Sequence, residues 1–288
     1  MNKKRVFLTS TGCYIVQIET NLIAAYLKKN GYQLVKLIAK KIIIPFLFKT
    51  GYYQKFLETY GETKAIILLY HNIDSSSKHN FEKQMQFIKK HMQPISLNEL
   101  IDCLVKKKPS PPKSIVITLD DGYENIYHYA YPILKKYQIP ATIFLVTGYI
   151  DTTKNFWWDN SSILSWSQIK EMAKNGIDFG SHTINHYNLT TLSDKDIEEE
   201  LRVSKEKIEQ ELKKHVTGFC YPFGKKEHYN QKIKELVIKA GYQYAVTAEF
   251  GHINQSSDLF LLKRVPAGNE PLPYFVRNLA LALTENSY

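Results

Sequence analysis

The feature that most constrains the fold of this 288-residue chain is an alternation of short apolar runs with helix-type patterns from Ala65 onward. Strands buried on both faces read as continuous apolar runs, and strands that alternate with amphipathic helices are typical of parallel sheets built from βα units. The sequence therefore predicts an α/β fold. The expected strands are 65–69, 115–119, 142–146 and 177–179, and the expected helices are 81–91, 127–137, 167–175 and 194–214.

Two adjacent carboxylates stand where one of these strands ends. The run 115–119 is followed directly by Asp120, Asp121 and Gly122. Strand ends commonly carry catalytic groups, and Gly permits the turn that both carboxylates need to reach one site, since neighbouring strand residues otherwise point to opposite faces. An Asp-Asp-Gly sequence taken alone is often only a turn, because Asp side chains cap nearby backbone N–H groups.

Two histidines follow the expected strand 177–179. His182 and His186 are four residues apart, so one tight turn can direct both imidazoles to one point. A carboxylate oxygen with two imidazole nitrogens suits Zn²⁺ or a similar divalent metal that keeps an open coordination position. Two such histidines also occur on solvated helix faces, so the pattern becomes specific only together with the carboxylates and a third segment, Cys220–Gly224.

In combination, the three segments resemble the motifs of the NodB-type polysaccharide deacetylases, the family 4 carbohydrate esterases. Thr118–Gly122 matches their T-F-D-D-G motif, His182–His186 matches H-[ST]-x-x-H, and Cys220–Gly224 matches the R-x-P-[YF]-G loop without its Arg. The resemblance covers roughly residues 64 to 270. It is strongest to the branch that contains the poly-N-acetylglucosamine de-N-acetylases.

The resemblance implies a fold and a domain organisation. We expect an irregular (β/α)7 barrel of the polysaccharide deacetylase type, with residues 61–288 as the catalytic domain and residues 1–60 as a basic N-terminal extension.

The resemblance also implies roles for individual residues. Asp121, His182 and His186 would hold the metal, and Asp120 would act as the general base toward water. The late L-x-H motif that supplies the acid in most of the family is absent after residue 224. In the branch named above the barrel is circularly permuted. The resemblance therefore implies that His71, at the end of an early apolar strand, supplies the acid instead of the late motif. The alternative is that His71 merely closes that strand.

Aromatic residues are the candidates for substrate contact. The loop residues Tyr221, Pro222 and Phe223 are expected to shape the wall of the site, because Pro restricts the backbone and the following Gly allows a turn. Trp157 and Trp158 are expected to cover the apolar face of a sugar ring.

The predicted function is a metal-dependent hydrolase that removes N-acetyl groups from an N-acetylated sugar of a surface polysaccharide or its lipid-linked precursor. Zn²⁺ fits the ligands, while Co²⁺, Ni²⁺ and Fe²⁺ stay open because ligand type narrows the metal without fixing it. The alternative is a non-catalytic glycan-binding or membrane-tethering protein that retains the deacetylase fold. The missing Arg and the missing late His motif favour that alternative.

The first sixty residues carry most of the net charge. Ten Lys or Arg against two Glu leave +8 there, within a formal total of +10. Residues 34–57 mix the apolar run Ile42–Phe48 with lysines, and such a segment can lie on an anionic membrane surface or pack on the barrel with its lysines in water. The run is broken by Pro45 and is too short to span a bilayer. Nucleic acid is not an expected partner, because no binding motif accompanies the charge.

The compartment is inferred from cysteines and from the N-terminus. Cys13, Cys103 and Cys220 are odd in number and widely separated, which favours a reducing compartment. Met1–Arg5 resembles the start of a signal peptide, but Thr9–Gly12 interrupts the apolar stretch that follows. We therefore expect a cytoplasmic protein at the membrane face, with export to the cell envelope as the alternative.

Overall fold

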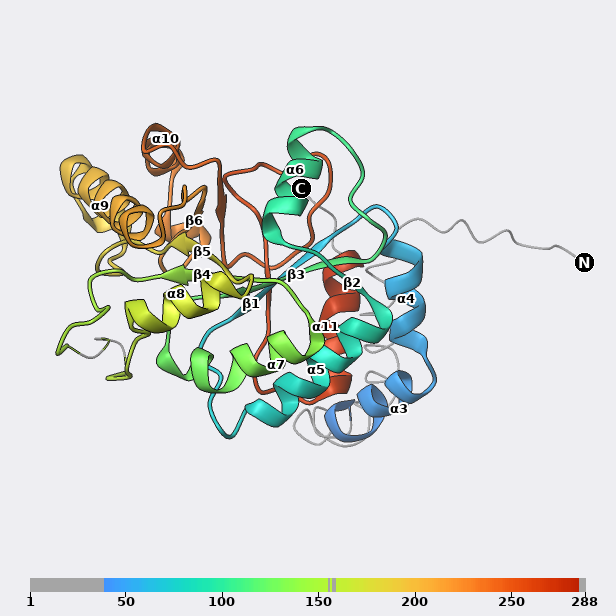
Figure 1. Ribbon diagram of the computed structural model, residues 1–288. Helices are drawn as coiled ribbons and strands as arrows, with labels where there is room; N and C mark the ends of the chain where they lie inside the picture. The colour runs from blue at the N-terminus through green and yellow to red at the C-terminus, as the bar shows by residue number, and fades with distance from the viewer. Residues whose placement is uncertain (1–38, 155, 157–158, 285–288) are drawn as a thin grey trace, which may run out of the picture.

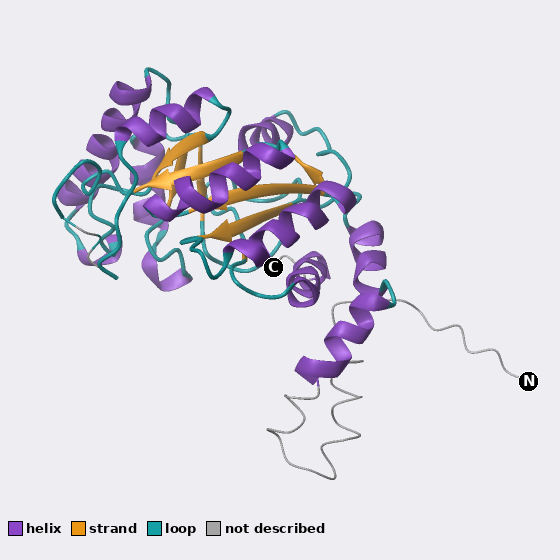
Figure 2. Ribbon diagram, turned by 60° about the horizontal axis from the view of Figure 1, so that its bottom comes forward, coloured by secondary structure: helices purple, strands orange, loops and turns teal. Residues whose placement is uncertain are grey.

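The computed structural model describes residues 39–154, 156 and 159–284, and it shows a curled sheet surrounded by helices (Figures 1 and 2). The strands are β1 (Ile66–Tyr70), β2 (Gln93–Pro94), β3 (Ser114–Leu119), β4 (Ala141–Leu145), β5 (Asp178–Ser181), β6 (Gly218–Cys220), β7 (Tyr244–Val246) and β8 (Val265–Pro266). The α-helices are α3 (Ile44–Lys49), α4 (Tyr52–Tyr60), α5 (Lys78–His91), α6 (Leu97–Val105), α7 (Tyr131–Tyr137), α8 (Trp166–Lys174), α9 (Asp194–Leu212), α10 (Gln231–Lys239) and α11 (Leu272–Thr284). Shorter helical segments are η1 (Ala39–Ile43), η2 (Ile126–Ala130), η3 (Leu189–Thr191) and η4 (Lys226–His228).

The sheet runs in the order β7-β6-β5-β4-β3-β1-β8, with every neighbouring pair parallel. The short β2 also pairs with β3. Leu262, just before β8, forms a parallel bridge to Val246 of β7, so this segment links the two ends of the curled sheet. The predicted α/β fold, an irregular barrel of the (β/α)7 type, is confirmed.

Alternation along the strands separates the inside of the barrel from the outside. Ile67, Val116 and Phe144 belong to an inner apolar cluster, whereas Ile66 and Leu68 belong to the cluster beneath the outer helices. Side chains of α6 join the inner cluster at the end where the strands begin. Polar side chains therefore collect at the opposite end, where the strands finish.

The helix predicted over 194–214 is the longest helix of the described chain. Ser193 caps it by accepting a hydrogen bond from the Asp196 backbone N–H at 3.3 Å. The helix ends at Leu212 because Lys213 adopts a left-handed conformation with φ of 53°. The other predicted elements lie within a few residues of the observed ones, as boundary predictions usually do.

The described part of the N-terminal extension packs on the barrel. Both α3 and α4 contact α11, and α11 in turn contacts β1 and α5. Tyr53 and Leu57 of α4 are buried, whereas Lys41 and Lys49 are exposed. Residues 34–57 were expected either to lie on a membrane surface or to pack on the barrel. For the apolar face of α4, the structure shows packing on the barrel.

Candidate active site

The carboxyl ends of β1, β3, β5 and β6 surround a cavity of about 410 Å³, which we call the central cavity. Parallel strands all finish at the same edge of a sheet, so residues far apart in sequence meet there. The residues lining this cavity include His71, Asp120, Asp121, His182, His186 and Tyr221.

Unusual backbone conformations let both motif segments face the cavity. Asp121 and Gly122 have φ of 71° and 75°, which turns the chain at the end of β3 so that both carboxylates reach one site. Thr183 and His186 also have positive φ, at 69° and 57°. Positive φ in non-glycine residues costs free energy and clusters at functional sites.

One carboxylate and two imidazoles converge on a common point. The Asp121 Oδ1 atom lies 3.5 Å from the Nε2 atoms of both His182 and His186. Among the described residues this buried Oδ1 accepts no hydrogen bond, and the three ligand atoms lie within 4.8 Å of one another. An unsatisfied buried oxygen facing two nitrogens fits a divalent cation between them.

The protonation states suit metal ligation. The His182 Nδ1 atom is 2.7 Å from the Cys220 carbonyl oxygen, which only accepts, so Nδ1 carries the proton and Nε2 offers its lone pair. Burial lowers the pKa of His182 to about 4 and that of His186 to about 3, so both are neutral at physiological pH. Burial and the neighbouring Asp120 raise the pKa of Asp121, as expected where a cation supplies the missing charge.

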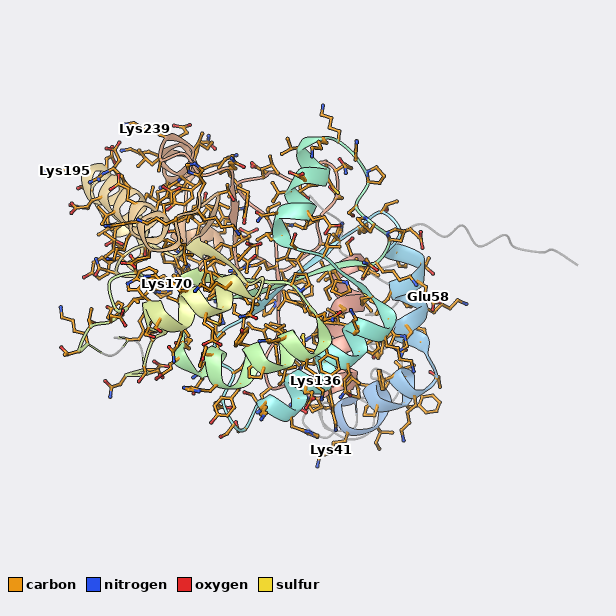
Figure 3. All side chains as sticks on the ribbon, viewed as in Figure 1. Lys41, Glu58, Lys136, Lys170, Lys195 and Lys239 are labelled. Carbon is orange, nitrogen blue, oxygen red and sulfur yellow. The ribbon has the colours of Figure 1, made fainter. Side chains whose placement is uncertain are left out.

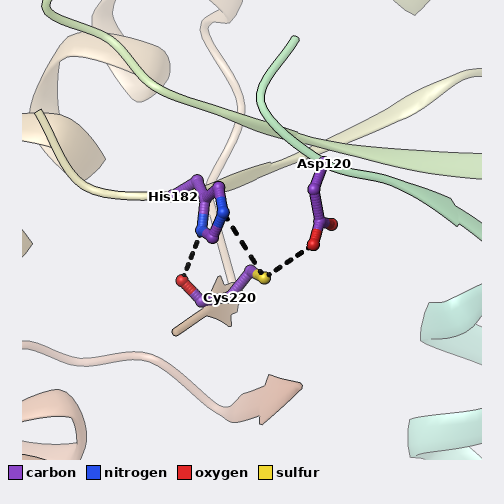
Figure 4. Close-up of side chains that lie close together, drawn as sticks. All are labelled: Asp120, His182 and Cys220. Carbon is purple, nitrogen blue, oxygen red and sulfur yellow. Dashed lines mark hydrogen bonds between the residues drawn. The ribbon is translucent and has the colours of Figure 1, made fainter. Parts of the chain in front are cut away.

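The second carboxylate has a different environment. Arg264 donates from Nη1 to the Asp120 Oδ1 at 2.8 Å and from Nη2 to Oδ2 at 2.7 Å. The Cys220 thiol lies 3.3 Å from the same Oδ2, as Figure 4 shows. Burial alone would raise the pKa of Asp120, but the Arg264 guanidinium holds it well below its usual range. Asp120 with His182 and Cys220 forms a second possible metal-binding group, yet its carboxylate is already committed to Arg264.

Sequence reasoning missed Arg264. The Arg absent from the loop motif is replaced by one from the segment before β8, 144 residues after Asp120. Arg264 is only 1% exposed. Its one signal in the sequence is the charged pair Lys263-Arg264 between the apolar residues Leu262 and Val265.

Of the other predicted site residues, some line the central cavity and some lie outside the described part of the chain. His71 lines the central cavity at the end of β1, together with Tyr221 and Phe223, while Pro222 is buried beside them in the loop. Trp157 and Trp158 lie outside the described residues.

Some cavity residues were not predicted. Phe156 lines the cavity with its ring 5.6 Å from that of His186. Lys225 and His228 also line it.

A curled parallel barrel that gathers carboxylates and imidazoles at its strand ends carries the groups that metal-assisted hydrolysis needs. Residues 107–245 match the family model described as polysaccharide deacetylase. YxkH of Bacillus subtilis (strain 168) is 33% identical over 215 residues, which cover 73% of each chain. The chain belongs to the polysaccharide deacetylase family.

Other comparisons agree with this assignment. The poly-beta-1,6-N-acetyl-D-glucosamine N-deacetylase of Staphylococcus aureus (strain MRSA252) is 30% identical over 213 residues, covering 70% of this chain and 71% of that protein. The structure of the Streptococcus pyogenes deacetylase PplD in complex with acetate superposes with a TM-score of 0.66 and 26% identity, covering 77% of this chain and 99% of that one.

Across the described helices, none combines the length and apolar character needed to cross a membrane.

Proposed function

We propose that this protein is a metal-dependent de-N-acetylase that hydrolyses the acetamido group of an N-acetylated glycan. The observation that carries this proposal is the group Asp121, His182 and His186, with its three ligand atoms within 4.8 Å, beside the Arg-paired carboxylate of Asp120 in one cavity. A divalent metal held there, Zn²⁺ in the first instance, would supply a nucleophile at neutral pH by lowering the pKa of water toward roughly 7.

The chain's own residues would move the protons. Asp120, kept ionised by Arg264, takes a proton from the water as its oxygen adds to the acetyl carbonyl carbon. When the C–N bond breaks, the departing sugar amine takes a proton from the imidazolium form of His71, which lines the same cavity, and the proton held by Asp120 passes to solvent. The products are acetate and the free amine.

His71 lies in a setting that permits proton exchange. Protein atoms packed around its ring lower the pKa of His71, and the nearby Asp120 charge opposes that effect. Its imidazole is nonetheless accessible from the cavity.

The substrate proposed for the first assay is a β-1,6-linked N-acetylglucosamine oligomer, because a relative 30% identical to this chain carries that activity in its name. A lipid-linked N-acetylated sugar is the second substrate to test. The alternative function is a glycan-binding protein without turnover. One argument for it was the Arg missing from the loop, and Arg264 supplies a guanidinium to Asp120 instead.

The test is acetate release by protein stripped of metal and then given Zn²⁺ or Co²⁺. Asp121→Ala, His182→Ala and His186→Ala are expected to lose bound metal and activity together. Asp120→Asn is expected to keep the metal, measured by elemental analysis, and to lose roughly 10²–10⁴-fold in rate, as is typical of an acid–base group.

Asp102→Asn on α6, where Asp102 is exposed, serves as the matched control and should behave as wild type. Full turnover by metal-free protein would exclude the mechanism. Glycan binding without acetate release on either substrate would favour the alternative function.

We also propose that the segment η1–α3 touches an anionic membrane surface. Ile42 and Phe46 lie one helical turn apart and are 61% and 62% exposed, and the exposed Lys41 and Lys49 flank them; Lys41 projects away from the barrel (Figure 3). Phe46→Glu should reduce cosedimentation with phosphatidylglycerol vesicles. Equal sedimentation of wild type and variant would contradict the contact.

We propose that the protein lies at the cytoplasmic face of the membrane; the alternative is export to the cell envelope. Cell fractionation with antibodies against the protein distinguishes the two.

A further inference from the structure

A buried carboxylate outside the central cavity is not used by the proposed reaction. Glu200 of α9 is 5% exposed, and it is not among the residues that line that cavity. Glutamate is seldom buried unless it is paired, and Glu200 takes part in none of the ion pairs formed among the described residues. Its negative charge must therefore be met by hydrogen-bond donors.

The donors come from the turn that precedes His186. The Glu200 Oε2 atom accepts hydrogen bonds from the backbone N–H groups of Ile184 at 2.7 Å and Asn185 at 3.0 Å. The Oε1 atom accepts from the Asn185 Nδ2 atom at 2.6 Å. Successive backbone N–H groups that face one oxygen form an anion-binding concavity, and hydrogen bonds to a carboxylate are stronger than those to a neutral acceptor. One side chain of α9 thus fixes two consecutive residues of this turn.

The opposite side of the same turn is held by the loop that follows β4. The Thr147 N–H group donates to the Thr183 carbonyl oxygen at 3.1 Å. The Gly148 N–H group donates to the Ile184 carbonyl oxygen at 2.8 Å. The loop after β4 therefore binds the carbonyl groups of the turn, while Glu200 binds its N–H groups.

The conformation of the turn decides where His186 lies. Thr183 and His186 have φ of 69° and 57°, and such conformations in non-glycine residues persist only where surrounding contacts hold them. The rings of His182 and His186 have centroids 4.7 Å apart, and both Nε2 atoms lie 3.5 Å from the Asp121 Oδ1 atom. A turn that relaxed toward negative φ would move one imidazole away from the other two ligand atoms.

The same helix also contacts the chain just before His182. The helix α9 packs against β5 (Figure 1). The Oγ atoms of Ser204, one turn after Glu200, and Ser181, directly before His182, lie 2.7 Å apart. Contacts from α9 thus reach the backbone on both sides of the first histidine.

We propose that Glu200 is a positioning residue of the metal site, which holds the turn between His182 and His186 so that both imidazoles meet Asp121. The inference rests on the proposed function for the presence of a metal at these ligands. Contacts that orient metal ligands are typically worth about 10–100-fold in metal affinity. Loss of the Glu200 carboxylate should therefore weaken metal binding although every ligand is still present.

Zinc affinity tests this role without turnover. Zn²⁺ is titrated into the metal-free protein in competition with a chelator of known affinity. Glu200→Ala should weaken zinc binding about tenfold or more, and Glu200→Gln, which keeps one accepting oxygen, should weaken it less. Glu199→Ala is the matched control, since Glu199 is the exposed neighbour on α9, and it should bind zinc as the wild type does.

An exchange of hydrogen-bonding partners separates positioning from general stability. Glu200→Gln alone places an amide against the Asn185 amide, and Asn185→Asp alone places two carboxylates together. The double variant again has a donor that faces an acceptor, so it should recover part of the zinc affinity that each single change loses. Visible absorption of the Co²⁺-loaded protein should change in Glu200→Ala, because the bands report the arrangement of the ligands. Calorimetry of the metal-free variants checks that each folds.

The outcomes separate the two ideas. Zinc affinity and cobalt bands equal to wild type in folded Glu200→Ala would overturn the positioning role, even if its Tm falls. If Glu200→Ala does not fold, Glu200→Gln and the double variant decide, and equal zinc affinity in these two would also overturn it. Absence of acetate release by the wild type, with the expected order of zinc affinities, would instead overturn the proposed reaction and leave the role of Glu200 intact.

Discussion

At the scale of single residues, two adjacent carboxylates acquire opposite properties from their partners. Asp120 faces a guanidinium through two hydrogen bonds, whereas Asp121 faces two neutral imidazoles. Arg264 also donates from Nε to the Thr247 carbonyl and from Nη1 to Thr118 Oγ1, which holds its plane in place. These environments support the roles proposed above, Asp120 as the base and Asp121 as a metal ligand.

Replacing Arg264 tests this division. In Arg264→Met the buried Asp120 has no cationic partner, and loss of one member of a buried ion pair destabilises proteins by roughly 3–5 kcal/mol. Burial then raises the pKa of Asp120, so a larger fraction is protonated at a given pH. The acidic limb of the pH–rate profile should move to higher pH, with metal content unchanged.

The control is Arg264→Lys, which keeps a positive charge but not the paired geometry and should shift the profile less. An unaltered acidic limb in Arg264→Met would show that Arg264 does not set the ionisation of Asp120.

The sequence was sufficient to predict the cluster of Asp120, Asp121, His182 and His186, because strand ends and motif spacing are local properties. The partner of Asp120 was not predictable in the same way. Arg264 comes from a segment with no turn or spacing signal, and only the closure of the sheet brings it to Asp120.

At the scale of elements, the close approach of β4, β5 and β6 depends on glycine. A Cβ atom on Gly180 would lie 2.5 Å from ring carbons of Phe144 and 3.0 Å from the Gly218 carbonyl oxygen. Gly180 thereby allows the inner Phe144 ring to lie against β5, directly before His182. Packing inside the barrel and the position of His182, a proposed metal ligand, are linked at this residue.

Gly180→Ala should therefore be destabilising. Forcing an extra methyl group into a packed core typically costs about 1–3 kcal/mol, which lowers Tm by roughly 2–4 °C per kcal/mol in domains of about 150–250 residues. Differential scanning calorimetry measures the change. Gly268→Ala is the control, because its nearest neighbour would be 3.7 Å away; similar Tm values for the two variants would contradict the packing argument.

The element types were predictable from apolar runs and helix patterns, and the cap at Ser193 was predictable from its residue type. The short strands β2, β6, β7 and β8 were not among the predicted ones. Each has only two or three residues in the ladder, and their pairing depends on neighbours distant in sequence rather than on a local pattern.

At the scale of the whole molecule, the N-terminal helices and the C-terminal helix form one layer. Figure 1 shows α3 and α4 beside α11, and contacts of both helices with α11 confirm the arrangement. Lys64, which follows α4, donates to the Leu283 carbonyl oxygen near the end of α11 at 2.7 Å. The described extension is thus part of the same packed body as the barrel.

Leu57→Ala tests whether this layer contributes to global stability. Leu57 is 2% exposed, and truncating a buried Leu usually costs about 2–5 kcal/mol. We expect one cooperative urea unfolding transition at lower urea concentration. Phe46→Ala, at a side chain 62% exposed, should change stability by no more than about 0.5 kcal/mol. An unchanged barrel transition in Leu57→Ala would mean that the extension folds separately.

The late position of Arg264 in the chain makes the proposed site depend on closure of the barrel. Asp120 lies at the end of β3, and its guanidinium partner comes from the segment just before β8, which pairs with β1. The strands β1 to β7 carry both carboxylates and both histidines, but without the segment before β8 the buried Asp120 would lack its guanidinium counter-charge. We therefore expect the proposed activity to require the closed barrel.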